Sequence, residues 1–136
     1  MTETTVATVG FLVLSFIEGF NGLGLAFRTK RTLTSAGVVH ADGPGLLIQE
    51  FGVYSVGIAV AYLVAALDPI RFCGIGIAGI VINLLAGGMH LFRSAGVYFG
   101  DARPMMNRAS ERKASFVHAF ALLVLFISQR GVGPLT

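Results

Sequence analysis

The stretch LLIQEFGVYSVGIAVAYLVAALDPIRFCGIGIAGIVINLLAGGMHLF, Leu46–Phe92, decides the fold. It holds two apolar runs, 46–67 and 70–92, and each reaches the roughly 20 residues that a helix needs to cross a bilayer. Asp68 and Pro69 separate the runs, because proline cannot continue the helical hydrogen-bond ladder and this dipeptide is a typical helix start. The stretch therefore predicts a hairpin of two transmembrane helices.

Two further apolar segments flank this hairpin. The first covers 6–27, and the last covers 111–129 and is apolar from Ala114 onward. We expect one all-α domain over 1–136, an antiparallel four-helix bundle in the membrane. Its helices are predicted at about 6–27, 46–67, 70–92 and 111–129.

The composition supports a membrane protein. The chain is 54% hydrophobic and 12% charged, with a mean hydropathy of +0.78, whereas soluble domains have about 25% charged residues. The net charge of +3 does not indicate nucleic-acid binding, because the basic residues lie between the apolar runs. Cys73 is the single cysteine, which excludes an internal disulfide.

The distribution of basic residues predicts the orientation. Eight of the ten Lys and Arg residues lie in the two polar segments 28–45 and 93–113. Because cytoplasmic loops carry an excess of Lys and Arg, we expect both segments in the cytoplasm. Both termini are then extracytoplasmic.

Polar side chains inside the apolar runs form the candidate site. A charged residue at the centre of a membrane helix costs roughly 2.5–3.5 kcal/mol on insertion scales, so each one calls for a reason. Asn83, Gly87 and His90 recur at i, i+4 and i+7, on one helix face. Six residues are predicted to form an inward-facing polar cluster in the cytoplasmic half of the bundle: Glu18, Asn21, Glu50, Asn83, His90 and His118.

Three interpretations of this cluster remain open. Its members can form structural interhelical hydrogen bonds, worth about 0.6–2 kcal/mol each. A Glu–His pair can relay protons to a quinone head group. A metal ion is the least favoured alternative, because the Glu-x-x-His motif of metal-binding bundles is absent; its candidate ligands are Glu18, Glu50, His90 and His118.

The hairpin resembles the DoxX-like family of small four-helix bacterial membrane proteins. The likeness lies mainly in 46–92, in the order Glu50, Gly52, Gly57, Arg71 and a closing His90. Glu18 departs from the family pattern. The resemblance implies a multi-pass protein of the bacterial plasma membrane that takes part in quinone-linked complexes as a small subunit.

We therefore expect a small subunit or accessory protein of a larger membrane complex, with a quinone-linked complex as one candidate. The alternative is a membrane protein that binds a small ligand, a quinone or a metal at the polar cluster. A transporter is a third interpretation, which would require oligomerisation. Catalytic residues are not recognisable, so the chain is not expected to be an enzyme by itself. The expected partners are membrane lipid and either a larger complex or further copies of the chain.

Overall fold

The computed structural model describes residues 2–38, 45–97, 106–130 and 132. Over these residues the chain is all-helical, apart from turns and one isolated β-bridge. The described residues form five helices: α1 (Glu3–Phe27), α2 (Thr29–Ser35), α3 (Gly45–Leu67), α4 (Cys73–Ser94) and α5 (Arg108–Gln129).

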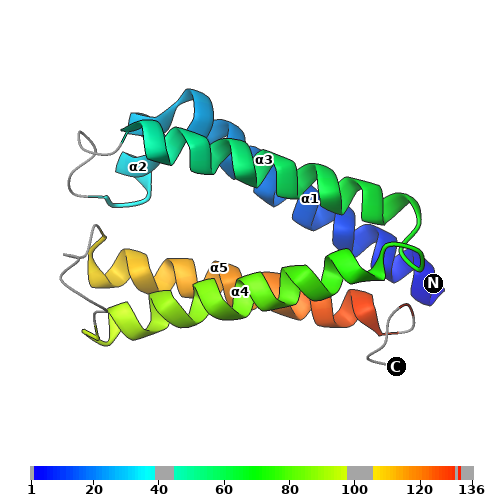
Figure 1. Ribbon diagram of the computed structural model, residues 1–136. Coiled ribbons are helices and arrows are strands. Elements are labelled where there is room, and N and C mark those ends of the chain that lie inside the picture. Colours follow the sequence, from blue (N-terminus) through cyan, green and yellow to red (C-terminus); the bar gives the residue numbers. More distant parts are fainter. Residues whose placement is uncertain (1, 39–44, 98–105, 131, 133–136) are drawn as a thin grey trace.

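The four long helices are arranged as two pairs, α1 with α3 and α4 with α5 (Figure 1). Within the first pair, the Thr8 hydroxyl donates to the Ala66 carbonyl and the Ser15 hydroxyl donates to the Ala59 carbonyl. An early residue of α1 thus meets a late residue of α3, so these two helices run in opposite directions. The start of α1 and the end of α5 lie at the same end of the molecule, which we call the terminal end.

The two pairs share a core near that end. Buried side chains from all four long helices meet there: Phe11, Leu14, Tyr62, Ala65, Ala66, Ile80, Ala121 and Leu125. The rings of Phe11 and Tyr62 stack, with centroids 6.1 Å apart. Away from this core the pairs diverge in Figure 1, so packing between them is concentrated in the terminal half of the helices.

Glycines allow close helix approach within the first pair. A Cβ atom on Gly22 would lie 2.8 Å from the Gly52 carbonyl oxygen, and one on Gly52 would lie 2.5 Å from the Ala26 nitrogen. Neither backbone can yield without moving a helix. The small residues therefore set the separation of α1 and α3, as in other membrane helix pairs.

At the opposite end, the segment after α2 touches the start of α5. Val38 forms an isolated antiparallel bridge with Met106. Gly37, which ends α2 with a φ of +77°, lies against Ser110. At the end far from the termini, the segment after α2 therefore contacts the start of α5.

Several element bounds differ from the sequence expectation. The helix α2 occupies part of a segment predicted as a loop. Helix α4 begins at Cys73 rather than at residue 70, because the Asp68 carboxylate accepts from the Arg71 N–H and 69–72 form a turn. Helix α5 begins at Arg108 rather than at residue 111, because the Asn107 side chain caps it.

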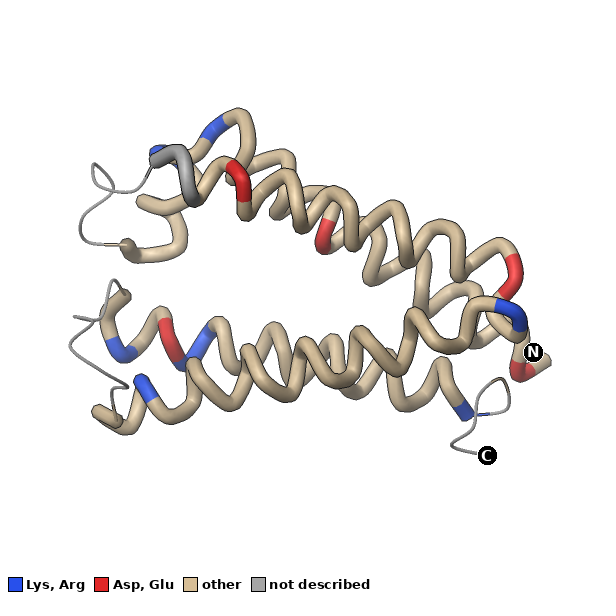
Figure 2. The backbone as a smooth tube through the Cα atoms, viewed as in Figure 1, with Lys and Arg blue, Asp and Glu red and all other residues tan. Residues whose placement is uncertain are grey.

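Three of the described helices are long and apolar enough to cross a membrane: 3–27, 48–67 and 73–94. They correspond to three of the four predicted spans. The predicted fourth span lies in α5, which is not among them. Figure 2 shows that most Lys and Arg residues gather at the end opposite the termini.

Candidate functional site

Two polar stripes face each other along the α4–α5 interface. Each stripe has residues at i, i+4 and i+7, which places them on one helix face. The stripes consist of Asn83, Gly87 and His90 on α4, and of Glu111, Ser115 and His118 on α5. Asn83 bonds to His118, Gly87 to Ser115 and His90 to Glu111, so the two helices run in opposite directions here.

Asn83 fixes the imidazole of His118. Its Nδ2 donates to the Gly79 carbonyl one turn earlier, at 2.9 Å, so its Oδ1 points to α5 as an acceptor. The Nδ1 of His118 lies 2.8 Å from this oxygen and must carry the proton as the donor. The neutral imidazole of His118 then has its lone pair on Nε2.

Glu111 fixes the second imidazole, that of His90. Its Oε2 lies 2.5 Å from Nδ1 of His90, and its side chain is only 2% exposed. Its other oxygen, Oε1, lies 4.0 Å from a guanidinium nitrogen of Arg93. Because a carboxylate only accepts, His90 also donates through Nδ1, and in the neutral imidazole the lone pair is then on Nε2.

The location of Glu111 favours its negative charge. It is in the first turn of α5, where the free N–H groups and the helix dipole stabilise an anion. Arg93 lies in the last turn of α4, where a cation is favoured. The dipoles of α5 and α4 therefore stabilise the charges of Glu111 and Arg93, respectively.

The two imidazole rings stack on each other. Their centroids are 5.5 Å apart and their planes are inclined by 15°. Neither Nε2 atom has a hydrogen-bond partner in the part of the chain that the structure describes. The site therefore offers two adjacent nitrogen acceptors at the helix interface, each held in one tautomer by its own partner.

Gly87 permits this arrangement. A Cβ atom at residue 87 would lie 2.9 Å from the Cβ of His118. The Ser115 hydroxyl donates to the Gly87 carbonyl at 3.4 Å, a long hydrogen bond. The absence of a side chain at Gly87 thus lets His118 reach Asn83 and stack on His90.

The structure brings together three of the six residues proposed from the sequence, namely Asn83, His90 and His118. Glu18 is half-buried on α1, on the stripe of Phe11 and Leu14 that faces the shared core, and makes no hydrogen bond with another described residue. Asn21 and Glu50 have exposed side chains. They lie outside the two polar stripes of α4 and α5.

Glu111 is the site residue that the sequence analysis does not propose. It lies next to Arg112 and Lys113 in a polar segment, and a carboxylate in such a segment is usually a solvent-exposed residue at the start of a helix. Its signal is the spacing Glu111, Ser115 and His118, which repeats that of Asn83, Gly87 and His90. All three residues lie within the predicted helix 111–129, so this spacing could have been found from the sequence.

The described residues contain no group of three or more His, Cys, Asp or Glu side chains close enough to hold a metal ion. The proposed ligand set Glu18, Glu50, His90 and His118 is thus not assembled among them. Of this set, the structure brings only His90 and His118 together. Their Nδ1 atoms are held by the Glu111 carboxylate and the Asn83 amide.

Comparisons of the chain with family models, with curated proteins and with solved structures find no match.

Proposed function

We propose that the chain crosses a bacterial plasma membrane four times as an antiparallel bundle, with both termini outside. Three helices meet the length and hydropathy that a span requires, and the shorter apolar run of α5, from Ala114 to Gln129, is proposed as the fourth. The gathering of Lys and Arg at the loop end supports a cytoplasmic location for that end. The resemblance to DoxX-like proteins also implies a four-helix membrane bundle.

Labelling of single cysteines tests this placement. In a Cys73→Ser background, a membrane-impermeant thiol reagent added to intact cells is expected to label Thr2→Cys. It is expected to label Lys113→Cys only after the cells are opened. Labelling of Lys113→Cys in intact cells would overturn the orientation.

Within this placement, we propose that the chain binds a small ligand of the quinone class through its histidine pair. The observation that carries this proposal is that His90 and His118 each present an unpartnered Nε2 at the same interface. A hydroxyl of a quinol head group donates to such an acceptor. Both histidines lie in the cytoplasmic half of the proposed bundle.

Proton transfer follows from the same hydrogen bonds. A proton that moves from a ligand hydroxyl to Nε2 of His90 gives an imidazolium whose Nδ1–H donates to Glu111. The carboxylate stabilises this cation, as in other His–carboxylate pairs. Arg93, at the loop end of the two polar stripes, lies next to Glu111. In this proposal the chain binds the ligand and exchanges its proton, while a partner protein transfers electrons.

Quinone content tests this proposal. The protein purified in mild detergent is expected to carry about one quinone per chain, measured by organic extraction and ultraviolet absorbance. His118→Phe retains a stacked ring but removes Nε2, and His90→Phe does the same at its position. Both variants are expected to lose the quinone, whereas Glu50→Gln, at an exposed carboxylate, retains it. Full occupancy in both histidine variants would contradict the proposal.

A non-catalytic accessory subunit is the second candidate. The core shared by the two helix pairs lies in the half of the helices near the terminal end. A helix of a partner protein can therefore pack on the other half of either pair, which favours this candidate. In this case the chain co-purifies with larger membrane proteins in native mass spectrometry. His90→Phe and His118→Phe would leave that association intact.

A further inference from the structure

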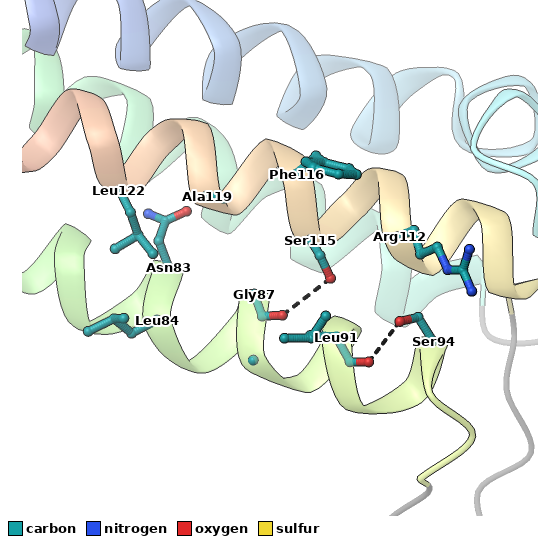
Figure 3. Close-up of a pocket in the computed structure, with 11 residues that line it drawn as sticks. Asn83, Leu84, Gly87, Leu91, Ser94, Arg112, Ser115, Phe116, Ala119 and Leu122 are labelled. Carbon is teal, nitrogen blue, oxygen red and sulfur yellow. Dashed lines mark hydrogen bonds between the residues drawn. The ribbon is translucent and has the colours of Figure 1, made fainter.

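A groove runs between α4 and α5 beside the histidine pair: its lining includes Asn83, Gly87 and Ser115 of the two polar stripes, but neither histidine. Its cavity volume is about 510 Å³, which lies within the range of about 300–1,000 Å³ typical of small-molecule sites. Figure 3 shows its walls, formed by Leu84 and Leu91 from α4 and by Phe116 and Leu122 from α5. Gly88 also lines the groove, and a Cβ atom added there would meet no atom within 4 Å.

The groove opens on the outer face of the α4–α5 pair. On α5 it is lined by Arg112, Phe116 and Ala119, which follow each other at i, i+4 and i+7. Ser128 and Val124 lie on another side of the same helix, where they contact Gly10 of α1. The groove therefore faces away from α1, toward the surrounding lipid in the proposed membrane placement.

One end of the groove is polar. Arg112, Ser94 and Ser115 lie toward that end, and Leu84 lies toward the other (Figure 3). The guanidinium of Arg112 has no ion-pair partner among the described residues, whereas Arg93 on α4 lies near Glu111. Arg112, unpaired within the described part of the chain, thus lies at the loop end of a groove that is lined mainly by apolar residues.

We propose that this groove binds one anionic phospholipid of the cytoplasmic leaflet, with its phosphate on Arg112 and an acyl chain along Leu84, Leu91 and Phe116. The inference rests on the proposed membrane placement and not on the proposed quinone site. Arg112 is the fifth residue of α5, close to the loop end of the helix, at the level where head groups of that leaflet would lie. Basic pockets between membrane helices on the cytoplasmic side suit such head groups.

The chemistry of the groove favours a phospholipid over other occupants. A partner helix is about 10–12 Å wide with its side chains and would contact the whole outer face rather than fill a bounded cavity. A neutral amphiphile would leave the Arg112 charge unmatched. A phosphate satisfies the guanidinium with charge-assisted hydrogen bonds, while the chain fills the apolar walls.

Native mass spectrometry of the full-length protein with defined lipids tests the proposal. The probes are phosphatidylglycerol and phosphatidylcholine with identical acyl chains, titrated onto delipidated protein in detergent. One phosphatidylglycerol is expected to bind about fivefold more tightly than phosphatidylcholine, because one basic residue near an anionic surface contributes about that factor. Arg112→Ala is expected to abolish the preference, and the adjacent Lys113→Ala, outside the groove, to retain it.

A second pair of variants tests the channel itself. Gly88→Leu fills the groove and is expected to abolish binding of the single lipid. Gly57→Leu is the matched control, because a Cβ atom at this residue of α3 also meets nothing within 4 Å. Equal binding of the two lipids, or an unchanged preference in Arg112→Ala or Gly88→Leu, would overturn the proposal.

The cysteine labelling described above separates this result from the placement. If Lys113→Cys is labelled in intact cells, both the placement and the lipid site fail. If the labelling agrees with the placement but the lipid preference is absent, the lipid site alone fails.

Discussion

The imidazoles of His90 and His118 stack on each other, although each is held by a different partner. Glu111 of α5 holds His90 of α4, and Asn83 of α4 holds His118 of α5. Each helix thus orients the histidine of the other, so the two stripes form one reciprocal unit. This unit carries both the packing of α4 on α5 and the proposed ligand chemistry.

Removal of Glu111 should loosen the α4–α5 pair. Glu111→Ala is expected to lower the free energy of unfolding by about 1–2 kcal/mol, the upper part of the range for interhelical polar contacts in membranes. Unfolding in mixed micelles with increasing denaturing detergent measures it. Glu50→Ala, at an exposed carboxylate, should change stability by less than about 0.5 kcal/mol. Equal effects of the two substitutions would refute the structural role of Glu111.

Asn83 and His118 should be energetically coupled. A double-mutant cycle with Asn83→Ala and His118→Ala is expected to give a coupling energy between about 0.6 and 1.7 kcal/mol. The same unfolding measurement supplies the four stabilities. A cycle of His118→Ala with Asn21→Ala, whose side chain is exposed on α1, should be additive. A coupling near zero for the first cycle would mean that the hydrogen bond between Asn83 and His118 does not form.

Gly22 and Gly87 should tolerate no side chain. Alanine at either residue places a Cβ atom within 3 Å of the facing helix, and such overpacking costs about 1–3 kcal/mol. A Cβ atom at Gly57 would meet no atom within 4 Å, so Gly57→Ala should instead be neutral or stabilising by up to about 1 kcal/mol. Thermal unfolding in detergent compares the three variants, and a stabilised Gly22→Ala would show that α1 and α3 are farther apart.

Two serines, the half-buried Ser15 and the buried Ser128, should respond differently to alanine. The Ser15 hydroxyl donates to the Ala59 carbonyl of α3 at 2.8 Å, so Ser15→Ala should cost about 0.5–1.5 kcal/mol. The Ser128 hydroxyl is buried with no hydrogen-bond partner in the described structure. Ser128→Ala removes an unsatisfied group and should be neutral or stabilising. A larger loss at Ser128 than at Ser15 would contradict this difference, again by thermal unfolding.

Local properties of the sequence determined much of this protein. Apolar runs predicted four membrane helices, and three of the described helices are long and apolar enough to cross a membrane. Asp68 with Pro69 predicted the turn between two of them. The excess of Lys and Arg in two segments predicted one positive end, which Figure 2 shows. Hydropathy, helix length and charge act through neighbouring residues, so they can be read without a partner segment.

Only the tertiary structure decided which polar groups meet. Glu111 contacts His90, which is 21 residues away, and His118 contacts Asn83, which is 35 residues away, whereas Glu50 remains exposed on α3. These outcomes depend on which helices pair, on their rotation about their axes and on the start of α5 at Arg108. Helical periodicity places residues on one face of a helix, but the neighbour that covers this face is selected by packing between distant segments.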